Sequence, residues 1–410
     1  MKTKSTKIFR IIGVSIVVLI GFIAIWLLSA SLTYSSEYVR RVIAWGESDL
    51  NDYLYNFPYR SLDAAPEPFI FDEDPDPLPI AETFESILQI KNLESFLEET
   101  NTQSFIVIQD DKILYEKYFN NARRDSMMTS FSVAKSFTSA LVGIAIGEGY
   151  IESVDDSITL YLPELIERDP RFEDITIRHL LLMASGLNYQ EMRFAIFNGD
   201  DPLTTYYTDQ REAALEFTNI NDPPGEYFNY NKYHPQLLGL ILERATGSSV
   251  TDYLQEKIWD PIGMEFEGSW SLDSEDSGFE KMEAGINARA IDFAKFGRLY
   301  LQSGEWNGTP VISRDWIAES TQVERPTHSD AYYPDEFGQT IYNDLEGYYK
   351  YMWYGYFRDG DEYDLAAEGD HGQFIYVSPS KNLIIVRNGL EYGIPWHEWV
   401  ELFYTFASDL

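Results

Sequence analysis

The stretch FSVAKSFTSALVGIAIGEG, residues 131–149, is the part of this 410-residue chain that most constrains its fold. Its run of small and apolar residues, closed by Gly-Glu-Gly, predicts a buried helix from Ser132 to about Gly147. A spacing of three residues places the Ser132 hydroxyl and the Lys135 amine on one face of that helix. A serine at a helix N-terminus lies beside N–H groups that can stabilise an oxyanion, and a buried lysine can accept its proton. The segment therefore predicts a nucleophilic serine next to its own base.

A second Ser-x-x-Lys sequence shows how weak this spacing is alone. About one such match is expected by chance in a chain of this length. Ser378 and Lys381 form that second match, with a proline directly after the serine, in a turn between two β-rich runs. No helix can align the pair there, so we interpret it as the chance match.

Two predicted hairpins flank the central part of the chain. Residues 104–109 and 112–119 are β-rich runs joined by a two-residue acidic turn. Residues 373–377 and 383–387 form a similar pair around the sequence Ser-Pro-Ser-Lys-Asn.

Between the hairpins most segments have helical periodicity, for example residues 235–246 and 290–301, and residues 398–406 form a last amphipathic helix. Strands at both ends with helices between them predict an α+β fold. We expect an antiparallel sheet built from N- and C-terminal strands, flanked by helices, with a mainly helical insertion lobe.

The N-terminus differs from the rest of the chain. Residues 11–28 contain no charge, and as a helix they nearly cross a bilayer core at about 1.5 Å per residue. Four basic residues and no acidic ones precede them, which favours a cytoplasmic N-terminus and an extracytoplasmic body at the cell membrane. The apolar run is longer than a typical cleaved signal, although residues 29–31 resemble a cleavage site. We therefore expect residues 1–33 to be a membrane anchor, a single transmembrane helix or uncleaved signal.

Two further regions follow. Residues 34–85 are expected to be a Pro- and Asp-rich linker, within which residues 39–54 could form a short amphipathic helix near the membrane. Residues 86–410 are expected to be one globular domain, large enough to be two-lobed.

Charge and composition exclude several classes of function. The 31 Lys and Arg against 67 Asp and Glu give a net charge of −36, which repels nucleic acid. Cysteine is absent, which excludes thiol nucleophiles and Cys-ligated metals. His397 and Glu398 lack the second histidine of a zinc helix, and no phosphate loop or dinucleotide fingerprint occurs. We expect no metal and no cofactor.

Several segments occur in the order typical of one family. They are FSVAKSF (131–137), ITIRHLLLMASGL (175–187), PGEYFNY (224–230) with LLG (237–239), PIGM (261–264), ARAIDFAKFG (288–297) and GDHGQ (369–373). In these motifs residues 86–410 resemble the serine β-lactamase and penicillin-binding-protein superfamily. The similarity is to its class C-like branch of esterases, D-aminopeptidases and 6-aminohexanoate-dimer hydrolases, which implies a β-lactamase/transpeptidase-like fold.

The resemblance implies a role for each matched position. Ser132 would be the nucleophile, Lys135 its proton acceptor or a cation that tunes the base, and Tyr230 a second base that relays a proton to the leaving group. The backbone N–H groups of Ser132 and Gln373 would form the oxyanion hole. His179 and Ser185 are more plausibly structural, since no Gly-x-Ser-x-Gly elbow surrounds Ser185.

Two departures from the family pattern concern substrate binding, for which we expect Lys232, Asp370, His371 and Gly372. Lys232 stands where the family often has Asn. Asp370 stands where it has Lys or His, unless a one-residue shift puts His371 there. Both changes argue against β-lactam and cell-wall DD-peptide substrates, whose carboxylate a cation at the third motif normally meets. We expect Lys232 and Asp370 to face each other across the cleft within about 8 Å, one Debye length.

The expected function is that of a membrane-anchored extracytoplasmic serine hydrolase acting on a small ester, linear amide or peptide through an acyl-enzyme. A D-amino-acid-directed peptidase or β-lactamase is the enzyme alternative, and a catalytically silent protein that binds cell-envelope ligands is the other. The aromatic residues between 348 and 356 are expected to form a buried strand or, alternatively, to line an apolar acyl pocket.

Overall fold

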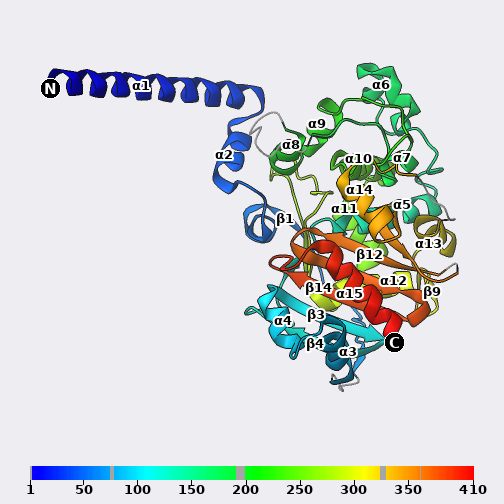
Figure 1. Ribbon diagram of the computed structural model, residues 1–410. Coiled ribbons are helices and arrows are strands. Elements are labelled where there is room, and N and C mark those ends of the chain that lie inside the picture. Colours follow the sequence, from blue (N-terminus) through cyan, green and yellow to red (C-terminus); the bar gives the residue numbers. More distant parts are fainter. Residues whose placement is uncertain (1, 74–77, 191–198, 324–328, 361) are drawn as a thin grey trace.

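A mainly antiparallel sheet forms the centre of the protein in the computed structural model, which describes residues 2–73, 78–190, 199–323, 329–360 and 362–410 (Figure 1). In spatial order its strands are β10 (Gly347–Lys350), β11 (Trp353–Phe357), β12 (Tyr363–Gly369), β13 (Gln373–Ser378), β14 (Leu383–Gly389), β3 (Thr102–Gln109), β4 (Lys112–Tyr118) and β2 (Asp72–Glu73). Neighbouring strands are antiparallel except β2 and β4, which are parallel.

The middle of this sheet joins strands from the two ends of the domain. β14 pairs with β3, so Ile385 lies opposite Val107 and Val386 opposite Ile106. The two hairpins predicted from the sequence are β3–β4 and β13–β14. The predicted α+β class, with an antiparallel sheet that combines N- and C-terminal strands, is therefore confirmed.

Helices cover both faces of the sheet, which explains why its central strands are continuous apolar runs. On one face, α12 (Ala290–Leu301) packs so closely that a Cβ on Gly297 would lie 2.9 Å from Ile375. On the other face, Phe403 of α15 (Trp396–Asp409) has its ring 5.7 Å from the rings of both Phe374 and Tyr376. The helices predicted at 290–301 and 398–406 are thus confirmed.

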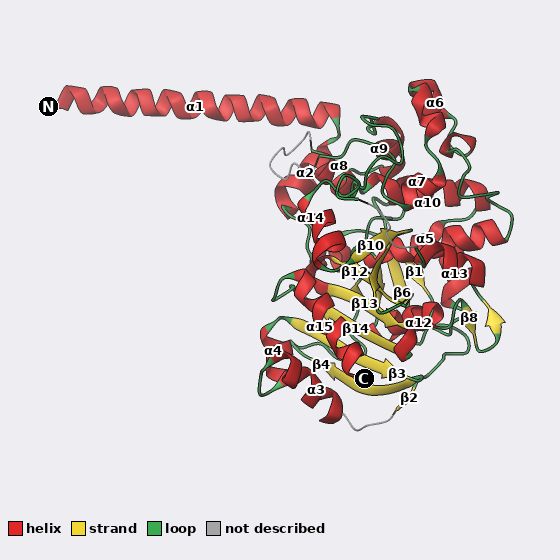
Figure 2. Ribbon diagram, turned by 45° about the vertical axis from the view of Figure 1, so that its right-hand side comes forward, coloured by secondary structure: helices red, strands yellow, loops and turns green. Residues whose placement is uncertain are grey.

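Much of the chain between the two hairpins, from α5 to α11, forms a mainly helical lobe above the sheet (Figure 2). Its helices are α5 (Val133–Gly147), α6 (Glu164–Arg168), α7 (Ile177–Leu181), α8 (Asp200–Tyr206), α9 (Gln210–Glu216), α10 (Tyr233–Thr246) and α11 (Val250–Leu254). Of the remaining helices, α3 (Leu78–Leu88) and α4 (Leu93–Glu99) precede β3 in the sequence, whereas α13 (Arg314–Thr321) and α14 (Glu336–Gln339) lie between α12 and β10. Helix α5 contacts α10 as well as β12 and β13, so it lies between the lobe and the sheet.

Smaller sheets that the sequence did not predict complete the body. One has the order β1 (Tyr59–Leu62), β6 (Gly268–Ser271), β7 (Ile286–Ala288) and β5 (Met128–Thr129), and β5 leads directly into Ser132. The other pairs β8 (Glu305–Trp306) with β9 (Thr309–Pro310). Each of these strands has only two to four residues, too few for a period-two pattern to stand out.

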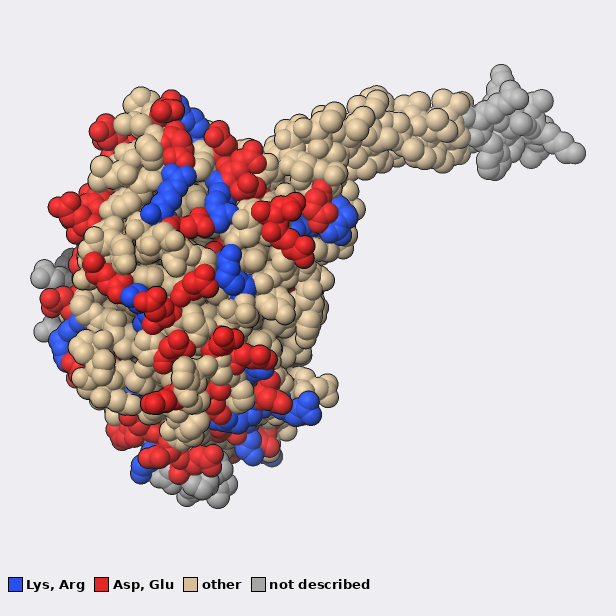
Figure 3. Space-filling model, turned by 180° about the vertical axis from the view of Figure 1, so that it is seen from behind, with Lys and Arg blue, Asp and Glu red and all other residues tan. Residues whose placement is uncertain are grey.

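Helix α1 (Lys2–Thr33) projects away from the body (Figure 1). Its stretch Ile11–Thr33 has 23 residues and reaches a mean hydropathy of 3.0, so it is long and apolar enough to cross a membrane. In Figure 3 the part of this helix that is not grey carries no charged side chains, whereas acidic groups are spread over the visible face of the body.

Part of the expected linker between residues 34 and 85 is packed onto the domain. Helix α2 (Ser36–Trp45), a π-helical turn (Asp52–Asn56) and strand β1 occupy its first half, and β1 pairs with β6. Aromatic rings such as Tyr53 and Phe57 are 3% and 2% exposed. Their burial outweighs the local Pro and Asp content that suggested an open connector. The Pro/Asp run at 74–77 lies outside the described residues.

Buried Arg387 in β14 fastens the turn between β12 and β13 to the rest of the sheet. Its guanidinium donates to the carbonyls of Gly372 (2.7 Å) and Thr100 (2.9 Å) and to the hydroxyl of Thr102 (3.0 Å). It also lies 4.0 Å above the ring of Trp399. Burial lowers the pKa of Arg387 to about 9. The planar group thereby connects three chain segments that are far apart in the sequence.

We expect Arg387→Met to lower the free energy of unfolding by about 3 kcal/mol or more, because each buried carbonyl left without a donor costs about 1–3 kcal/mol. Urea unfolding of the detergent-solubilised chain measures this. Arg123→Met is the control, since the Arg123 side chain is 82% exposed and its loss should change stability by less than about 0.5 kcal/mol. Equal unfolding midpoints for the two variants would refute the role given to Arg387.

Candidate active site

Ser132 lies at the N-cap of α5, immediately after a strained residue. Phe131 has a φ of +43°, a left-handed conformation that costs a non-glycine residue about 1–3 kcal/mol. The backbone N–H of Ser130 donates to the carbonyl of Ile286 in β7 (2.8 Å) and fixes the start of this turn. Ser132 itself is helical (φ −63°, ψ −11°) and half-buried, and its side chain lies at the N-terminal end of the helix.

Lys135 meets Ser132 as the helical spacing predicted. Its buried amine donates to the Ser132 hydroxyl at 2.8 Å and to the backbone carbonyl of Glu283 at 2.7 Å. Burial is the largest influence and lowers the pKa of Lys135 to about 7, and the positive charge of Lys232 lowers it further. Glu283, Asp370 and Asp201 act in the opposite direction. At neutral pH a large share of this amine is therefore uncharged and able to accept a proton.

Tyr230 lies on the loop before α10 and completes the group. The Lys135 amine is 5.0 Å from the centroid of the Tyr230 ring. Burial raises the pKa of Tyr230 above its ordinary value, while side-chain hydrogen bonds with Ser132 and Tyr354 act to lower it. The phenol is therefore protonated near neutral pH, which leaves Lys135 as the better proton acceptor in the free enzyme.

The third motif closes the site from the sheet. Gly369 ends β12 so close to the turn that precedes Ser132 that a Cβ there would lie 2.4 Å from the Ser130 carbonyl. His371 and Gly372 both have positive φ, and the chain then enters β13 at Gln373. The Gln373 side chain is held by Gly389 and Asn388, so only its backbone remains for a role in the cleft.

His371 and Asp370 differ in their surroundings. His371 Nδ1 lies 2.9 Å from the Leu390 carbonyl, which assigns it as a donor, and its ring stacks on Phe131 with centroids 4.9 Å apart. His371 thus supports Phe131, the residue that precedes Ser132. Asp370 is exposed and accepts a hydrogen bond from the His371 backbone at 2.9 Å.

Lys232 pairs with Asp201, a partner that the sequence did not suggest. Its amine contacts the Asp201 carboxylate and the Thr205 hydroxyl, the latter at 3.3 Å. Burial acts to lower the pKa of Lys232, but Asp201, with smaller contributions from Glu283 and Asp370, outweighs burial and leaves it raised. Asp370 thus acts on the Lys232 charge more weakly than Asp201 does, and the expectation that Lys232 and Asp370 face each other within about 8 Å stays a prediction.

Three further acidic residues belong to the site: Asp201, Glu283 and Glu368. Glu283 supplies the carbonyl that holds Lys135, and its carboxylate pairs with buried Lys281 at 2.7 Å. Glu368 accepts a hydrogen bond from Tyr356 at 2.5 Å, and burial raises its pKa to about 8. The sequence carries no signal for the contact between Glu283 and Lys135, because a backbone acceptor has no residue signature.

Other expected residues have structural positions. His179 completes a capping box with Thr176 at the start of α7. Ser185 Oγ lies 2.6 Å from His234 Nε2, and both side chains are buried, so Ser185 is not open to a substrate. The aromatic run at 348–356 forms the buried strands β10 and β11. Among the described residues, no group of three or more His, Cys, Asp or Glu could hold a metal ion.

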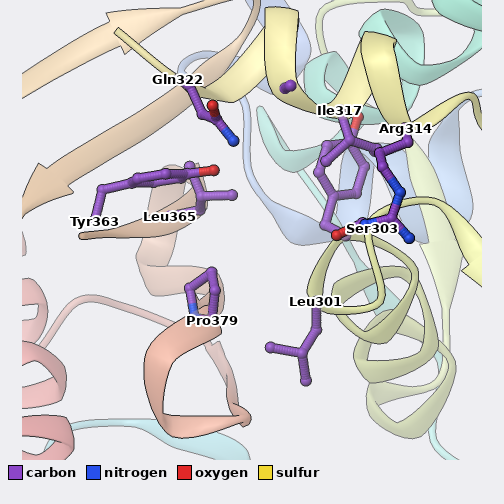
Figure 4. A pocket seen from close by; sticks show the side chains of 10 residues that line it. Leu301, Ser303, Arg314, Ile317, Gln322, Tyr363, Leu365 and Pro379 are labelled. Carbon is purple, nitrogen blue, oxygen red and sulfur yellow. The ribbon is translucent and has the colours of Figure 1, made fainter. Parts of the chain in front are cut away.

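A cavity of about 230 Å³ lies apart from these residues (Figure 4). It is bounded by the end of α12, by α13, by β12 and by Pro379. None of the residues named in the site lines it, so it contributes nothing to the chemistry proposed here.

Comparison with known proteins connects this arrangement to enzymes. A family model described as Beta-lactamase matches residues 91–388. The 6-aminohexanoate-dimer hydrolase of Paenarthrobacter ureafaciens is 25% identical over 315 residues, 73% of this chain and 75% of that protein. A D-aminopeptidase of Brucella anthropi is 28% identical over 34% of this chain and 26% of its own length. Esterase EstB of Burkholderia gladioli is 28% identical over 39% of this chain and 44% of its own length.

Solved structures show the same fold. A Bacillus anthracis structure described as a candidate 6-aminohexanoate-dimer hydrolase superposes with a TM-score of 0.72 at 21% identity, covering 87% of this chain and 92% of that one. A class C β-lactamase bound to cefoxitin gives a TM-score of 0.58 at 15% identity, covering 82% of this chain and all of the other. Because the family match spans most of the chain and the fold agrees with it, this protein belongs to the β-lactamase family and is a serine hydrolase.

Proposed function

We propose that this enzyme hydrolyses an ester or a linear amide through an acyl-enzyme on Ser132, with Lys135 and Tyr230 as proton-transfer groups. The observation that carries the proposal is the 2.8 Å contact between the buried Lys135 amine and the Ser132 hydroxyl. A neutral amine at that distance can take the serine proton as the oxygen attacks.

The reaction follows in two halves. Lys135 takes the Ser132 proton while Oγ bonds to the substrate carbonyl carbon, and the carbonyl oxygen becomes an oxyanion held by the N–H groups of Ser132 and Gln373. Tyr230 gives its proton to the leaving oxygen or nitrogen and is reprotonated from the Lys135 ammonium. Water then attacks the acyl carbon by the same steps in reverse and frees Ser132.

The charge of the third motif supports substrates without a carboxylate at that place. Asp370 is negative and exposed there, and the nearby Lys232 is already engaged by Asp201. A β-lactam or DD-peptide carboxylate would meet repulsion from Asp370. Similarity to a D-aminopeptidase makes a D-amino-acid-directed peptidase the second candidate.

The proposed location is a membrane, with α1 as the anchor and the catalytic domain outside the cytoplasm. The length and hydropathy of Ile11–Thr33 and the basic residues before it support this orientation.

A fluorophosphonate probe tests the nucleophile. We expect the full chain to be labelled and Ser132→Ala to lose labelling completely, because the probe bonds only to an activated serine. Ser378→Ala, in the other Ser-x-x-Lys sequence, is the matched control and should label like the wild type. Labelling that survives in Ser132→Ala would contradict the assignment.

The pH dependence of kcat/KM tests Lys135. Since only the neutral amine accepts a proton, kcat/KM should fall about tenfold per pH unit below pH 7, the pKa of Lys135, and level off above it. Lys381→Ala should leave this profile unchanged, whereas Lys135→Ala should abolish most activity. A flat profile between pH 5 and 8 would exclude Lys135 as the base.

Substrate preference tests the charge argument. We expect turnover of p-nitrophenyl esters and none of nitrocefin, whose carboxylate would face Asp370. Asp370→Lys should at least halve the KM for an ester that carries a carboxylate, relative to its neutral analogue. An unchanged ratio would show that Asp370 does not select the substrate.

A further inference from the structure

A segment outside the family match contributes to the active site. Residues 36–62 precede residues 91–388, the part of the chain that the family model covers. Their side chains nevertheless contact two parts of the structure that hold Ser132 and Lys135. One is Phe131, the residue before Ser132, and the other is the Lys281–Glu283 ion pair.

The first contact is between Tyr53 and Phe131. Their ring centroids are 5.2 Å apart at 71°, and His371 stacks on Phe131 at 4.9 Å. Phe131 therefore packs against rings from two segments, and this packing holds its backbone at φ +43°. Because Ser132 is the next residue, any relaxation of Phe131 moves the nucleophile.

The second contact is between Phe57 and the Lys281–Glu283 ion pair. The Lys281 amine is 4.6 Å from the centroid of the Phe57 ring and 2.7 Å from the Glu283 carboxylate. The Glu283 carbonyl in turn accepts from Lys135 at 2.7 Å. Phe57 thus shields a buried ion pair on the residue that holds the base, and burial makes such a pair sensitive to water.

Helix α2 fixes this segment in place. Arg41 donates to the Asp273 carbonyl at 2.5 Å and lies over the rings of Trp45 (5.3 Å) and Phe57 (5.5 Å). The Trp45 and Phe57 rings meet edge to face at 5.1 Å. In addition, the Tyr53 carbonyl accepts from Ser271 at 2.9 Å.

We propose that Tyr53 and Phe57 are positioning residues for catalysis: Tyr53 holds Phe131 and so the Ser132 turn, and Phe57 keeps water from the Lys281–Glu283 pair that seats Lys135. The inference rests on the proposed function, since it assigns Ser132 and Lys135 as the reacting groups.

A residue that positions the catalytic groups differs from one that only stabilises the fold, because its loss changes the pKa of Lys135. The groups that act on the Lys135 charge are Lys232, Glu283, Asp370 and Asp201, and the Tyr230 ring lies over its amine. Loss of the Phe57 ring admits water beside the Lys281–Glu283 pair, which relieves the burial of Lys135 and raises its pKa. The acid limb of the kcat/KM profile then moves to higher pH. A merely destabilised protein has fewer active molecules but keeps the wild-type limb.

The experiment compares Tyr53→Leu and Phe57→Leu in the full chain with Tyr55→Leu, a neighbour on the same turn that is 77% exposed. Active sites are counted by fluorophosphonate labelling, and rates are given per labelled site. We expect about a tenfold or greater loss of kcat in the first two variants, since small misplacements of reacting groups are costly. KM should stay within about twofold, and the acid limb should rise by about half a pH unit or more in Phe57→Leu. Tyr55→Leu should match the wild type.

The Tyr53→Phe variant tests whether the aromatic ring itself is what catalysis requires. Tyr53→Phe retains the ring and should restore kcat to within about twofold of wild type. Wild-type kcat per labelled site in Tyr53→Leu, with an unmoved acid limb in Phe57→Leu, would overturn the inference while leaving the proposed function intact. An absence of labelling in the wild type would overturn the proposed function itself, so the two failures are distinguishable. If the leucine variants do not fold, Tyr53→Trp and Phe57→Tyr replace them: the larger ring disturbs the contact with Phe131, the added hydroxyl brings polarity beside the Lys281–Glu283 pair, and each should lower kcat per labelled site.

Discussion

The active site depends on one hydrogen bond, from the buried Lys135 amine to the Ser132 hydroxyl. Placing an ammonium group in the protein interior is costly, so burial favours the uncharged amine and prepares it to accept a proton. The surrounding fold serves to keep this amine dry and aligned. Helix α5 is buried over most of its length, and the Glu283 carbonyl satisfies the amine from the opposite side.

Several close approaches of backbone support that bond. Gly369 brings the end of β12 against the turn that precedes Ser132, at a distance that no side chain would permit, and Arg387 donates a hydrogen bond to the turn that follows Gly369. Left-handed Phe131 stores strain at the same place. Such strain persists only where packing enforces it, which is why aromatic contacts gather around this residue.

The sequence predicted the parts of the structure that have local periodicity or a motif. Helix α12 and the β3–β4 and β13–β14 hairpins were identified from apolar patterns, and Ser132 with Lys135 from helical spacing. Asp201 and Glu283 were missed because their roles arise from tertiary contact, one through an ion pair and one through a backbone oxygen. The sequence favours a linker for residues 36–62, whereas the structure packs them on the domain, since nothing local distinguishes an aromatic ring that docks from one that does not.

Helix α1 leads directly into residues 36–62, which pack on the catalytic domain. This continuity has a consequence for how the enzyme meets its substrate. An enzyme on a flexible tether samples a volume set by the length of its linker. Here, α2 begins three residues after α1 ends, and the chain then packs on the domain. The domain is therefore joined to α1 by a short, packed connection and not by a flexible linker. With α1 in a bilayer, as proposed, the cleft would stay at a nearly constant height above the lipid surface. Substrates held at that height would reach the site by two-dimensional diffusion, and those in bulk solution by three-dimensional diffusion.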